Sequence, residues 1–270
     1  MQPSYQSGFY APGRGVAKHP ELWRGCVGAW DPGLGNTGLS LRDWGPKCRN
    51  GTIINPTPSV NWDVSDGIRN LKLLKASSHY VDCGTASAFG LSSSFSVTGW
   101  IRPSSVTVWQ RWASVGEYNT GWIAGVTSSG KLDLTVATGS WVICYGQTTL
   151  TPGVWTAVAV VADNISKTLA VYVNGKLDVA PVSFTGTILR PSASFLIGRS
   201  GVNSTYNWSG GLTDIRLYEK TITQSQIRLL AQRPGIAYEL APRKTYFIQA
   251  ATSTSQFYDV LSPLIFAGTN

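Results

Sequence analysis

Apolar and polar positions alternate through the central part of the chain. Residues 95–101 and 131–137 each place apolar side chains on one side and mainly polar ones on the other. Successive side chains of a strand point to opposite faces, so this period of two predicts half-buried strands. Residues 154–162 are apolar at consecutive positions, which predicts a strand covered on both faces. The side chains that this pattern predicts to be buried are Phe95, Val97, Val158, Val160, Val171 and Leu217.

Turn residues separate the predicted strands. Asn174 and Gly175 interrupt an apolar segment at 169–173 and the apolar position that follows. Asn-Gly between such segments predicts a two-residue hairpin, because both turn positions need positive φ. Ser-Ser-Gly at 128–130 predicts a second turn.

One helix is predicted. Thr223 and Gln226 have the spacing of a capping box, and Pro234 with Gly235 would end the segment. We expect a short helix over 223–232 that plugs one end of the fold. Many short strands with a single helix indicate an all-β protein, a two-sheet antiparallel jelly-roll sandwich with one short C-terminal helix.

Composition agrees with a turn-rich β protein. The 270 residues include 29 glycines and 14 prolines, and only 13% are charged. No apolar segment reaches membrane-spanning length. The net charge of +8 is spread along the chain without a dense basic run, so we expect no nucleic-acid partner and no membrane partner.

The beginning of the chain lacks a basic segment followed by an apolar one, so we expect no signal peptide and synthesis in a cytoplasm. In that compartment buried free thiols are favoured over disulfides. The four cysteines, which have no metal-type spacing, are Cys26, Cys48, Cys83 and Cys144.

Three regions follow one another. Residues 1–20 form an arm without hydrophobic period, 21–232 form the sandwich, and 233–270 form a C-terminal tail. The tail is too apolar for a solvated segment. We therefore expect the arm and the tail to dock onto other chains, with folding of the tail onto its own domain as the alternative. The side chains expected at that contact are Tyr5, Phe9, Tyr10, Phe247, Ile248, Phe257, Tyr258, Leu264 and Phe266.

The order of the strand motifs resembles the laminin-G-like, concanavalin A-like jelly roll. FSVTGWIRP, VWTAVAVVAD, LAVYVNGKL, FLIGRSG and GGLTDIRLYEKTIT occur in that order between residues 95 and 223. The resemblance implies the fold much more specifically than the function, because this scaffold carries lectins, adhesins and structural proteins alike.

The two ends of the sandwich resemble laminin-G-like proteins of bacteriophage and prophage structural regions. The segment 22–30 (LWRGCVGAW) matches closely, and RPGIAYELAPRK follows the helix. A second motif matches at Leu41, Asp43, Asn50, Gly51 and Thr52. This resemblance implies a non-enzymatic virion component, such as a capsid decoration protein, head fibre or tail-associated protein. It would form a homo-oligomer and contact other virion or capsid chains.

Residues for catalysis are scarce. His19 and His79 are the only histidines, and the four glutamates show no pairing with another acid at strand spacing. A glycosidase needs two carboxylates directed at one bond. We predict that the chain is not an enzyme and needs no cofactor.

Acidic residues occupy two family-typical calcium positions, Asp82 and Asp214. However, Lys75 and His79 stand where the resemblance places further acids, and a lysine opposes a cation. We therefore expect no metal there, and we expect Asp82 and Asp214 to have structural roles such as pairing with Arg216.

Aromatic residues give the alternative function, a carbohydrate-binding lectin or adhesion module that recognises host-surface or environmental glycans. The chain has 11 tryptophans and 11 tyrosines. Exposed rings can stack on sugars and amides can orient hydroxyls, whereas large aromatics also fill cores and intersubunit contacts. Trp30, Trp100 and Trp155 are expected in the core. The candidate glycan-binding residues are Trp109, Trp112, Tyr118, Asn119, Trp122, Trp141 and Tyr145.

Overall fold

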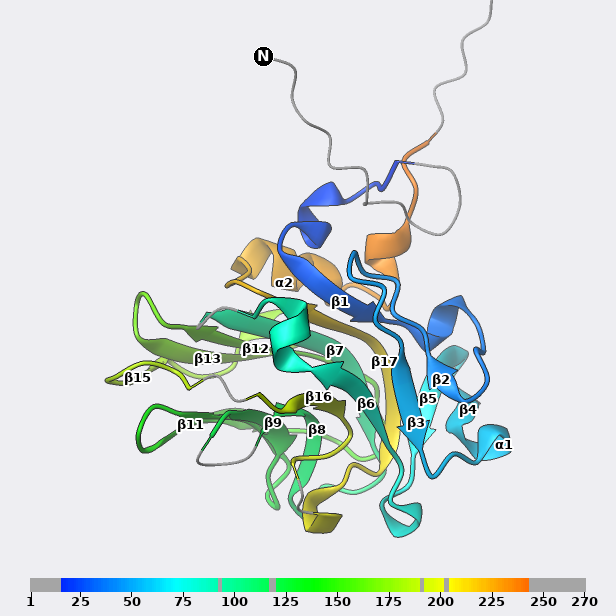
Figure 1. The fold of residues 1–270 in the computed structure, drawn as a ribbon, viewed down its shortest axis with the longest axis horizontal. Coiled ribbons are helices and arrows are strands. Elements are labelled where there is room, and N and C mark those ends of the chain that lie inside the picture. Colours follow the sequence, from blue (N-terminus) through cyan, green and yellow to red (C-terminus); the bar gives the residue numbers. More distant parts are fainter. Residues whose placement is uncertain (1–15, 92–93, 117–119, 190–191, 202–203, 243–270) are drawn as a thin grey trace, which may run out of the picture.

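The computed structural model describes residues 16–91, 94–116, 120–189, 192–201 and 204–242. Two antiparallel sheets pack face to face, as predicted for the jelly-roll sandwich (Figure 1). Sheet I contains, in spatial order, β14 (Lys176–Leu177), β13 (Thr168–Val173), β12 (Thr156–Asp163), β7 (Phe95–Pro103), β17 (Gly210–Tyr218), β5 (Ile68–Leu73) and β4 (Trp62–Ser65), with β1 (Cys26–Trp30) beside β17 and β15 (Val182–Ser183) beside β13.

Sheet II contains the strands that matter for the site. Their spatial order is β11 (Trp141–Thr149), β10 (Lys131–Ala137), β9 (Trp122–Val126), β8 (Gln110–Val115), β16 (Ser194–Ile197), β6 (Tyr80–Thr85), β3 (Gly51–Ile54) and β2 (Ser40–Leu41). Short helices connect or cover the sheets: η1 (Pro20–Trp23), η2 (Pro32–Leu34), α1 (Pro58–Asn61), η3 (Lys75–Ser77), η4 (Ala86–Phe89), η5 (Ser204–Tyr206), α2 (Gln224–Leu230) and η6 (Ile236–Tyr238).

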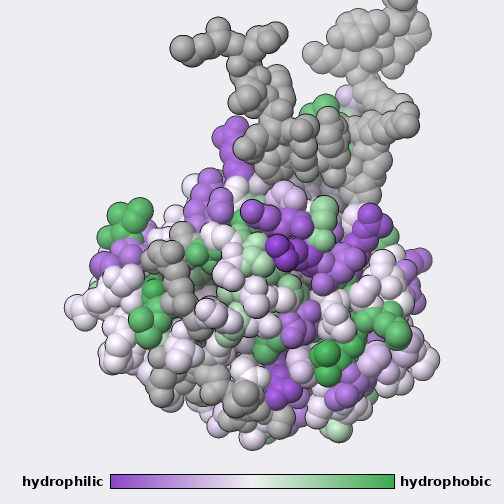
Figure 2. Space-filling model, in the orientation of Figure 1, coloured by the Kyte–Doolittle hydropathy of each residue, from purple (hydrophilic) through white to green (hydrophobic). Residues whose placement is uncertain are grey.

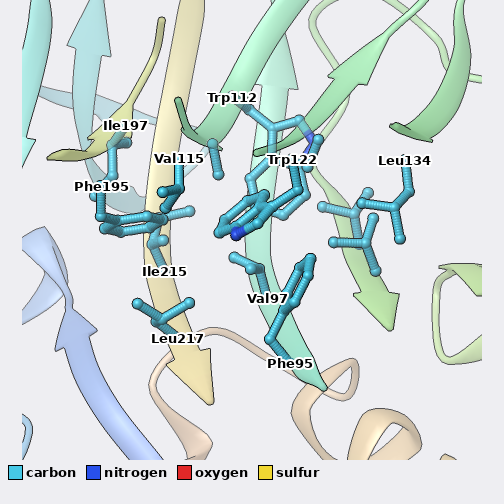
Figure 3. Packing of buried hydrophobic residues seen from close by; sticks show 14 of the residues in the cluster. Phe95, Val97, Trp112, Val115, Trp122, Leu134, Phe195, Ile197, Ile215 and Leu217 are labelled. Atoms are coloured by element: carbon cyan, nitrogen blue, oxygen red, sulfur yellow. The ribbon is translucent and has the colours of Figure 1, made fainter. Parts of the chain in front are cut away.

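The main core lies between the two sheets (Figure 3). Phe95 of β7 stacks on Trp122 of β9 with ring centroids 4.6 Å apart, which joins the sheets through their aromatic side chains. All six side chains predicted to be buried are 3% exposed or less. The period of two therefore identified the inward face correctly, since each inward position removes apolar surface from water.

A second apolar layer covers the outer face of sheet I. Ala159 and Val161 of β12 point away from the main core and pack with Trp23 of η1 and with Ile227 and Leu230 of α2. This confirms that β12 is covered on both faces. The helix does not plug an end of the sandwich, as the sequence suggested; it lies across sheet I because the apolar outer face of β12 has to be covered.

The predicted turns and helix start are confirmed. Asn174 and Gly175 have φ of 48° and 78° between β13 and β14, as the hairpin requires. Thr223 caps α2, and its capping box with Gln226 is complete.

Trp100 and Trp155 correct the core prediction, whereas Trp30 is fully buried as expected. The first two are only partly buried on the outer side of sheet I, where Trp100 donates to the Leu230 carbonyl and Trp155 to the Ser65 carbonyl. Tryptophan often lies at such boundaries, because its N–H needs a partner that the apolar core does not offer.

The two ends of the described chain meet on the covering layer. Ala17 and Leu240 form an antiparallel bridge, flanked by hydrogen bonds from the Lys18 amide to the Glu239 carbonyl and from the Ala241 amide to the Val16 carbonyl. Residues 236–238 are buried there, so the part of the predicted tail up to residue 242 belongs to the domain. The contact side chains predicted in the arm and the tail lie outside the described residues.

The cysteines are free thiols, as expected. Cys26, Cys83 and Cys144 are buried, but Cys48 is exposed. No helix in the described ranges is long and apolar enough to cross a membrane. On the face shown in Figure 2, hydrophobic side chains lie in small separate groups among polar ones.

Candidate functional site

The predicted aromatic residues divide between two environments. Trp112 and Trp122 are 0% and 3% exposed and point into the core, so for these two the alternative of core packing holds and they cannot stack on a sugar (Figure 3). Trp109, Trp141 and Tyr145 are partly exposed at the outer side of sheet II. Tyr118 and Asn119 lie outside the described residues.

A cross-strand row on the outer face of sheet II places charged groups beside these aromatics. Arg111 of β8 pairs in register with Gly125 of β9, Gly125 with Asp133 of β10, and Asp133 with Tyr145 of β11. Side chains of register partners share a face of the sheet. One row of four strands therefore carries an arginine, a glycine, an aspartate and a tyrosine.

Arg111 and Asp133 form a buried ion pair over Gly125. Nη1 of Arg111 donates to both carboxylate oxygens of Asp133 at 2.9 and 2.8 Å, and the side chains are 1% and 0% exposed. A Cβ at Gly125 would lie 2.3 Å from that Nη1 atom, so only glycine leaves room for the pair. Burial raises the pKa of Asp133 to about 6, against the opposing effect of Arg111.

Aromatic rings surround this pair. The rings of Trp109 and Tyr145 meet edge to face with centroids 6.3 Å apart. The Arg111 guanidinium carbon lies 4.9 Å from the ring centroid of Trp109 and 5.7 Å from that of Tyr206. Such cation–π contacts hold both the rings and the guanidinium in place. We call these three rings, together with exposed Trp141 four residues before Tyr145 on the same face of β11, the aromatic patch.

Asn207 extends the row at the other side of Arg111. The two residues form an isolated parallel bridge, so the Asn207 side chain lies on the same face as that of Arg111. Asn207 is fully buried, and neither its amide nitrogen nor its amide oxygen has a hydrogen-bond partner within the described structure. A buried amide without partners is costly, and an ordered water or another polar group would satisfy it.

The residues predicted from the sequence include Trp109, Trp141 and Tyr145, but neither Tyr206 nor the polar residues beside these rings. Asp133 stands at an outward position of an otherwise regular strand, KLDLTVA, where an acid next to two apolar neighbours could have indicated a paired charge. Arg111, Tyr206 and Asn207 carry no such local signal, because their proximity depends on strand order and on the connection from β16 to β17.

The two acids considered for calcium lie in different sheets. Asp82 of β6 accepts a hydrogen bond from the Gly84 amide. Asp214 of β17 pairs with Arg216 at 2.8 Å, as predicted, and accepts from the Gly235 amide. His79 is buried against Asn61. No group of three potential metal-ligating side chains occurs among the residues that the structure describes.

A second buried acid lies near Asp214. Asp31 accepts from the Gly33 amide and the Thr213 hydroxyl, and burial together with the charge of Asp214 raises its pKa to about 6. Arg216 is held between the rings of Trp23 and Tyr238, with its guanidinium carbon 4.7 and 4.5 Å from their centroids. These contacts fasten the covering layer to sheet I, on the side away from the aromatic patch.

Solved structures with the same fold include sugar-related proteins. Domain 4 of a GH43 extracellular arabinanase from Geobacillus stearothermophilus, in complex with arabinotriose, is 22% identical with a TM-score of 0.56, over 77% of this chain and 98% of that one. The binding domain of Paraclostridial Mosquitocidal Protein 1 is 12% identical with a TM-score of 0.58, over 78% and 52%. Trypanosoma rangeli sialidase is 14% identical with a TM-score of 0.57, over 77% and 32%. At these identities the likeness establishes the fold.

Sequence comparison is more specific. No curated protein sequence matches the chain. Residues 75–228, more than half of the chain, match the Laminin_G_3 family, described as the concanavalin A-like lectin/glucanases superfamily. The match spans the predicted motif series and the strands β6 to β17. The chain therefore belongs to the Laminin_G_3 family of concanavalin A-like jelly-roll domains.

Proposed function

We propose that this protein is a non-catalytic carbohydrate-binding module that binds glycans through the aromatic patch. The observation that carries the proposal is the exposure of Trp141 and Tyr145, at 48% and 45%, four residues apart on one face of β11. They are the most exposed of the described large aromatic side chains. Outward rings held above a buried polar row form the kind of surface on which a sugar ring can stack.

Rigidity supports this proposal. Tyr145 is held on a paired strand and against Trp109, and Trp109 is held against the buried Arg111. Side chains that are already ordered lose little conformational entropy when a ligand binds. The patch is therefore suited to binding without rearrangement.

The comparisons are consistent with the proposal. The family description includes lectins, and the arabinanase domain that shares the fold was solved with an oligosaccharide. Catalysis fits the site less well, because Asp133, the acid at its base, is occupied by Arg111 on both oxygens. A glycosidase requires two carboxylates facing one bond.

Affinity electrophoresis tests the proposal. The protein is run through gels that contain arabinan, xylan, galactomannan, polygalacturonate or heparin, and retardation by at least one polymer is expected. Trp141→Ala and Tyr145→Ala should each abolish most of that retardation. Trp155→Ala, which removes a partly exposed tryptophan from sheet I, is the matched control and should be retarded like the wild type. Equal retardation of all variants, or none of the wild type by any glycan, would refute binding through the patch.

A structural role in a bacteriophage particle is a second candidate. One observation favours it: residues 16–18 pair with 239–241, so the arm and the tail both continue from one place on the covering layer. In Figure 1 this place lies at the top, whereas β8, β9 and β11 lie at the bottom. A chain held by its ends would present the aromatic patch outward. Deleting residues 243–270 tests this role, which fails if the truncated protein still assembles and still joins particles.

A further inference from the structure

We propose that the buried Arg111–Asp133 pair makes the aromatic patch selective for neutral glycans, with Asp133 as the residue that excludes acidic ones. This inference rests on the proposed function and adds the substrate class. An unpaired arginine beside aromatic rings attracts anions, whereas an arginine bound to a carboxylate of the same protein does not.

Arg111 alone would make the patch an anion site. Its guanidinium is 1% exposed and lies beneath the patch, against the rings of Trp109 and Tyr206, so without a partner it would leave an uncompensated positive charge directly under the surface that attracts carboxylates or sulfates. The net charge of +8 would attract acidic polymers in addition.

Asp133 neutralises the positive charge of Arg111 from inside the protein. Both of its oxygens accept from Arg111, and both side chains are almost completely buried. An acidic sugar could replace Asp133 only by leaving a buried carboxylate without its partner, which is strongly unfavourable. The charges of the pair therefore cancel before a ligand arrives.

The surroundings of Asp133 keep it in that position. Its strand, β10, lies between β9 and β11, where Asp133 pairs with Gly125 on one side and with Tyr145 on the other. Its Oδ1 atom lies 2.8 Å from the place where a Cβ of residue 125 would be, so the carboxylate is seated over the glycine. This close seating favours a permanent pair over one that a ligand opens.

Asn207 adds a neutral polar group at the end of the same row. Its buried amide offers one donor and one acceptor, and neither has a partner within the described part of the chain. The amide is uncharged, so Asn207 adds no charge to the row beneath the patch.

The experiment compares neutral and acidic polymers on intact variants. Wild type, Asp133→Asn, and the double variant Arg111→Gln/Asp133→Asn are measured against arabinan, xylan and galactomannan, and against polygalacturonate and heparin. Salt at about 0.3 M suppresses attraction by the net charge. Asp66→Asn is the matched control, because it removes an acid from an exposed ion pair with Arg102 on sheet I and changes the net charge equally.

The wild type should bind the neutral polymer that retards it most at least about tenfold more tightly than either acidic polymer, which is the ratio that one hydrogen bond to a charged group can produce. Asp133→Asn should gain about tenfold toward at least one acidic polymer. The double variant and Asp66→Asn should not gain. Circular dichroism and thermal melting establish that each variant is folded.

Three results would overturn the inference. The first is a wild type that binds acidic polymers as tightly as neutral ones, through Tyr145. The others are a folded Asp133→Asn variant that gains no affinity for acidic polymers, and a double variant that gains as much affinity as Asp133→Asn. If Asp133→Asn does not fold, the relative affinity of the wild type for neutral and acidic polymers still tests the inference. A wild type that binds no polymer refutes the proposed function instead, so the two failures are distinguishable.

Discussion

Arg216 donates from Nε to Asp214 Oδ1 at 2.8 Å, although the two residues lie only two positions apart on β17. The strand is irregular between Thr213 and Arg216, and Asp214 has a φ of 48°. This local left-handed conformation brings the carboxylate of Asp214 beside the guanidinium. Both side chains are buried beneath the layer formed by η1 and η6, so the pair connects that layer to sheet I.

Replacing Asp214 by Ala should destabilise the protein by roughly 3–5 kcal/mol, because Arg216 would stay buried without its partner. Urea unfolding followed by tryptophan fluorescence measures this change. Asp66→Ala, at an exposed ion pair, should change the free energy of unfolding by no more than about 1 kcal/mol. Equal effects of the two substitutions would show that the buried pair contributes no more than a surface pair.

Gly125→Ala should destabilise the fold by about 1–3 kcal/mol and weaken glycan binding, because the new Cβ collides with Nη1 of Arg111, the Gln110 carbonyl oxygen and Oδ1 of Asp133. A double-mutant cycle is the appropriate measurement. In a protein that already carries Arg111→Ala and Asp133→Ala, the same Gly125→Ala change should cost less, because only the contact with the Gln110 carbonyl oxygen remains. Additive effects would contradict the steric explanation.

Asp31 should make the protein more stable in mild acid. Its folded pKa of about 6 lies above the ordinary value of 3.8, so the folded state binds a proton more readily than the unfolded state. Stability from this group is therefore gained as the pH falls from about 7 to 4, by up to ~3 kcal/mol. The gain is measured as the difference between wild type and Asp31→Asn in urea melts across this range. A constant difference would contradict the prediction.

His79 should make the protein less stable in mild acid. Asn61 uses its amide oxygen for the Thr57 amide, so its nitrogen donates to Nδ1 of His79 at 2.9 Å, and the ring must be neutral at that atom. Burial lowers the pKa of His79 below its ordinary value of 6.5. Stability from this group is present above pH 6.5 and is lost as the pH falls toward the folded pKa. His79→Gln should remove this acid-sensitive component, which the pH dependence of thermal melting would reveal.

The thiols should differ sharply in reactivity. Cys48 is exposed, whereas burial raises the pKa of Cys26 to about 12 and that of Cys144 to about 11, and it also raises the pKa of Cys83. Because the thiolate is the nucleophile, one maleimide should be incorporated quickly in the native protein and four after unfolding. Cys48→Ser should abolish the fast reaction. Fast labelling of that variant would contradict the buried position of the other three.

The local elements of this protein could be predicted from short stretches of its amino-acid sequence. Alternation in β7 and β10, the continuous apolar pattern of β12, the Asn174-Gly175 hairpin and the capping box at Thr223 are all encoded within a few neighbouring residues. Such signals arise from backbone sterics and from the burial of one face, so they do not need distant parts of the chain. The pairing of Asp214 with Arg216 could be predicted for the same reason, because only two positions separate these residues.

Which aromatic residues lie in the core and which lie at the surface depends on how the two sheets are assembled. Trp112 and Trp122 stand in the same stretch of sequence as Trp109, yet their places on the pleat and the bulge at β8 turn them inward. Likewise, the row from Arg111 through Gly125 and Asp133 to Tyr145 exists because four strands align in one register. Register and layer order are set by the collective burial of both sheets and their covering helix. A burial pattern of that kind is a property of the whole fold and has no signature at any single residue.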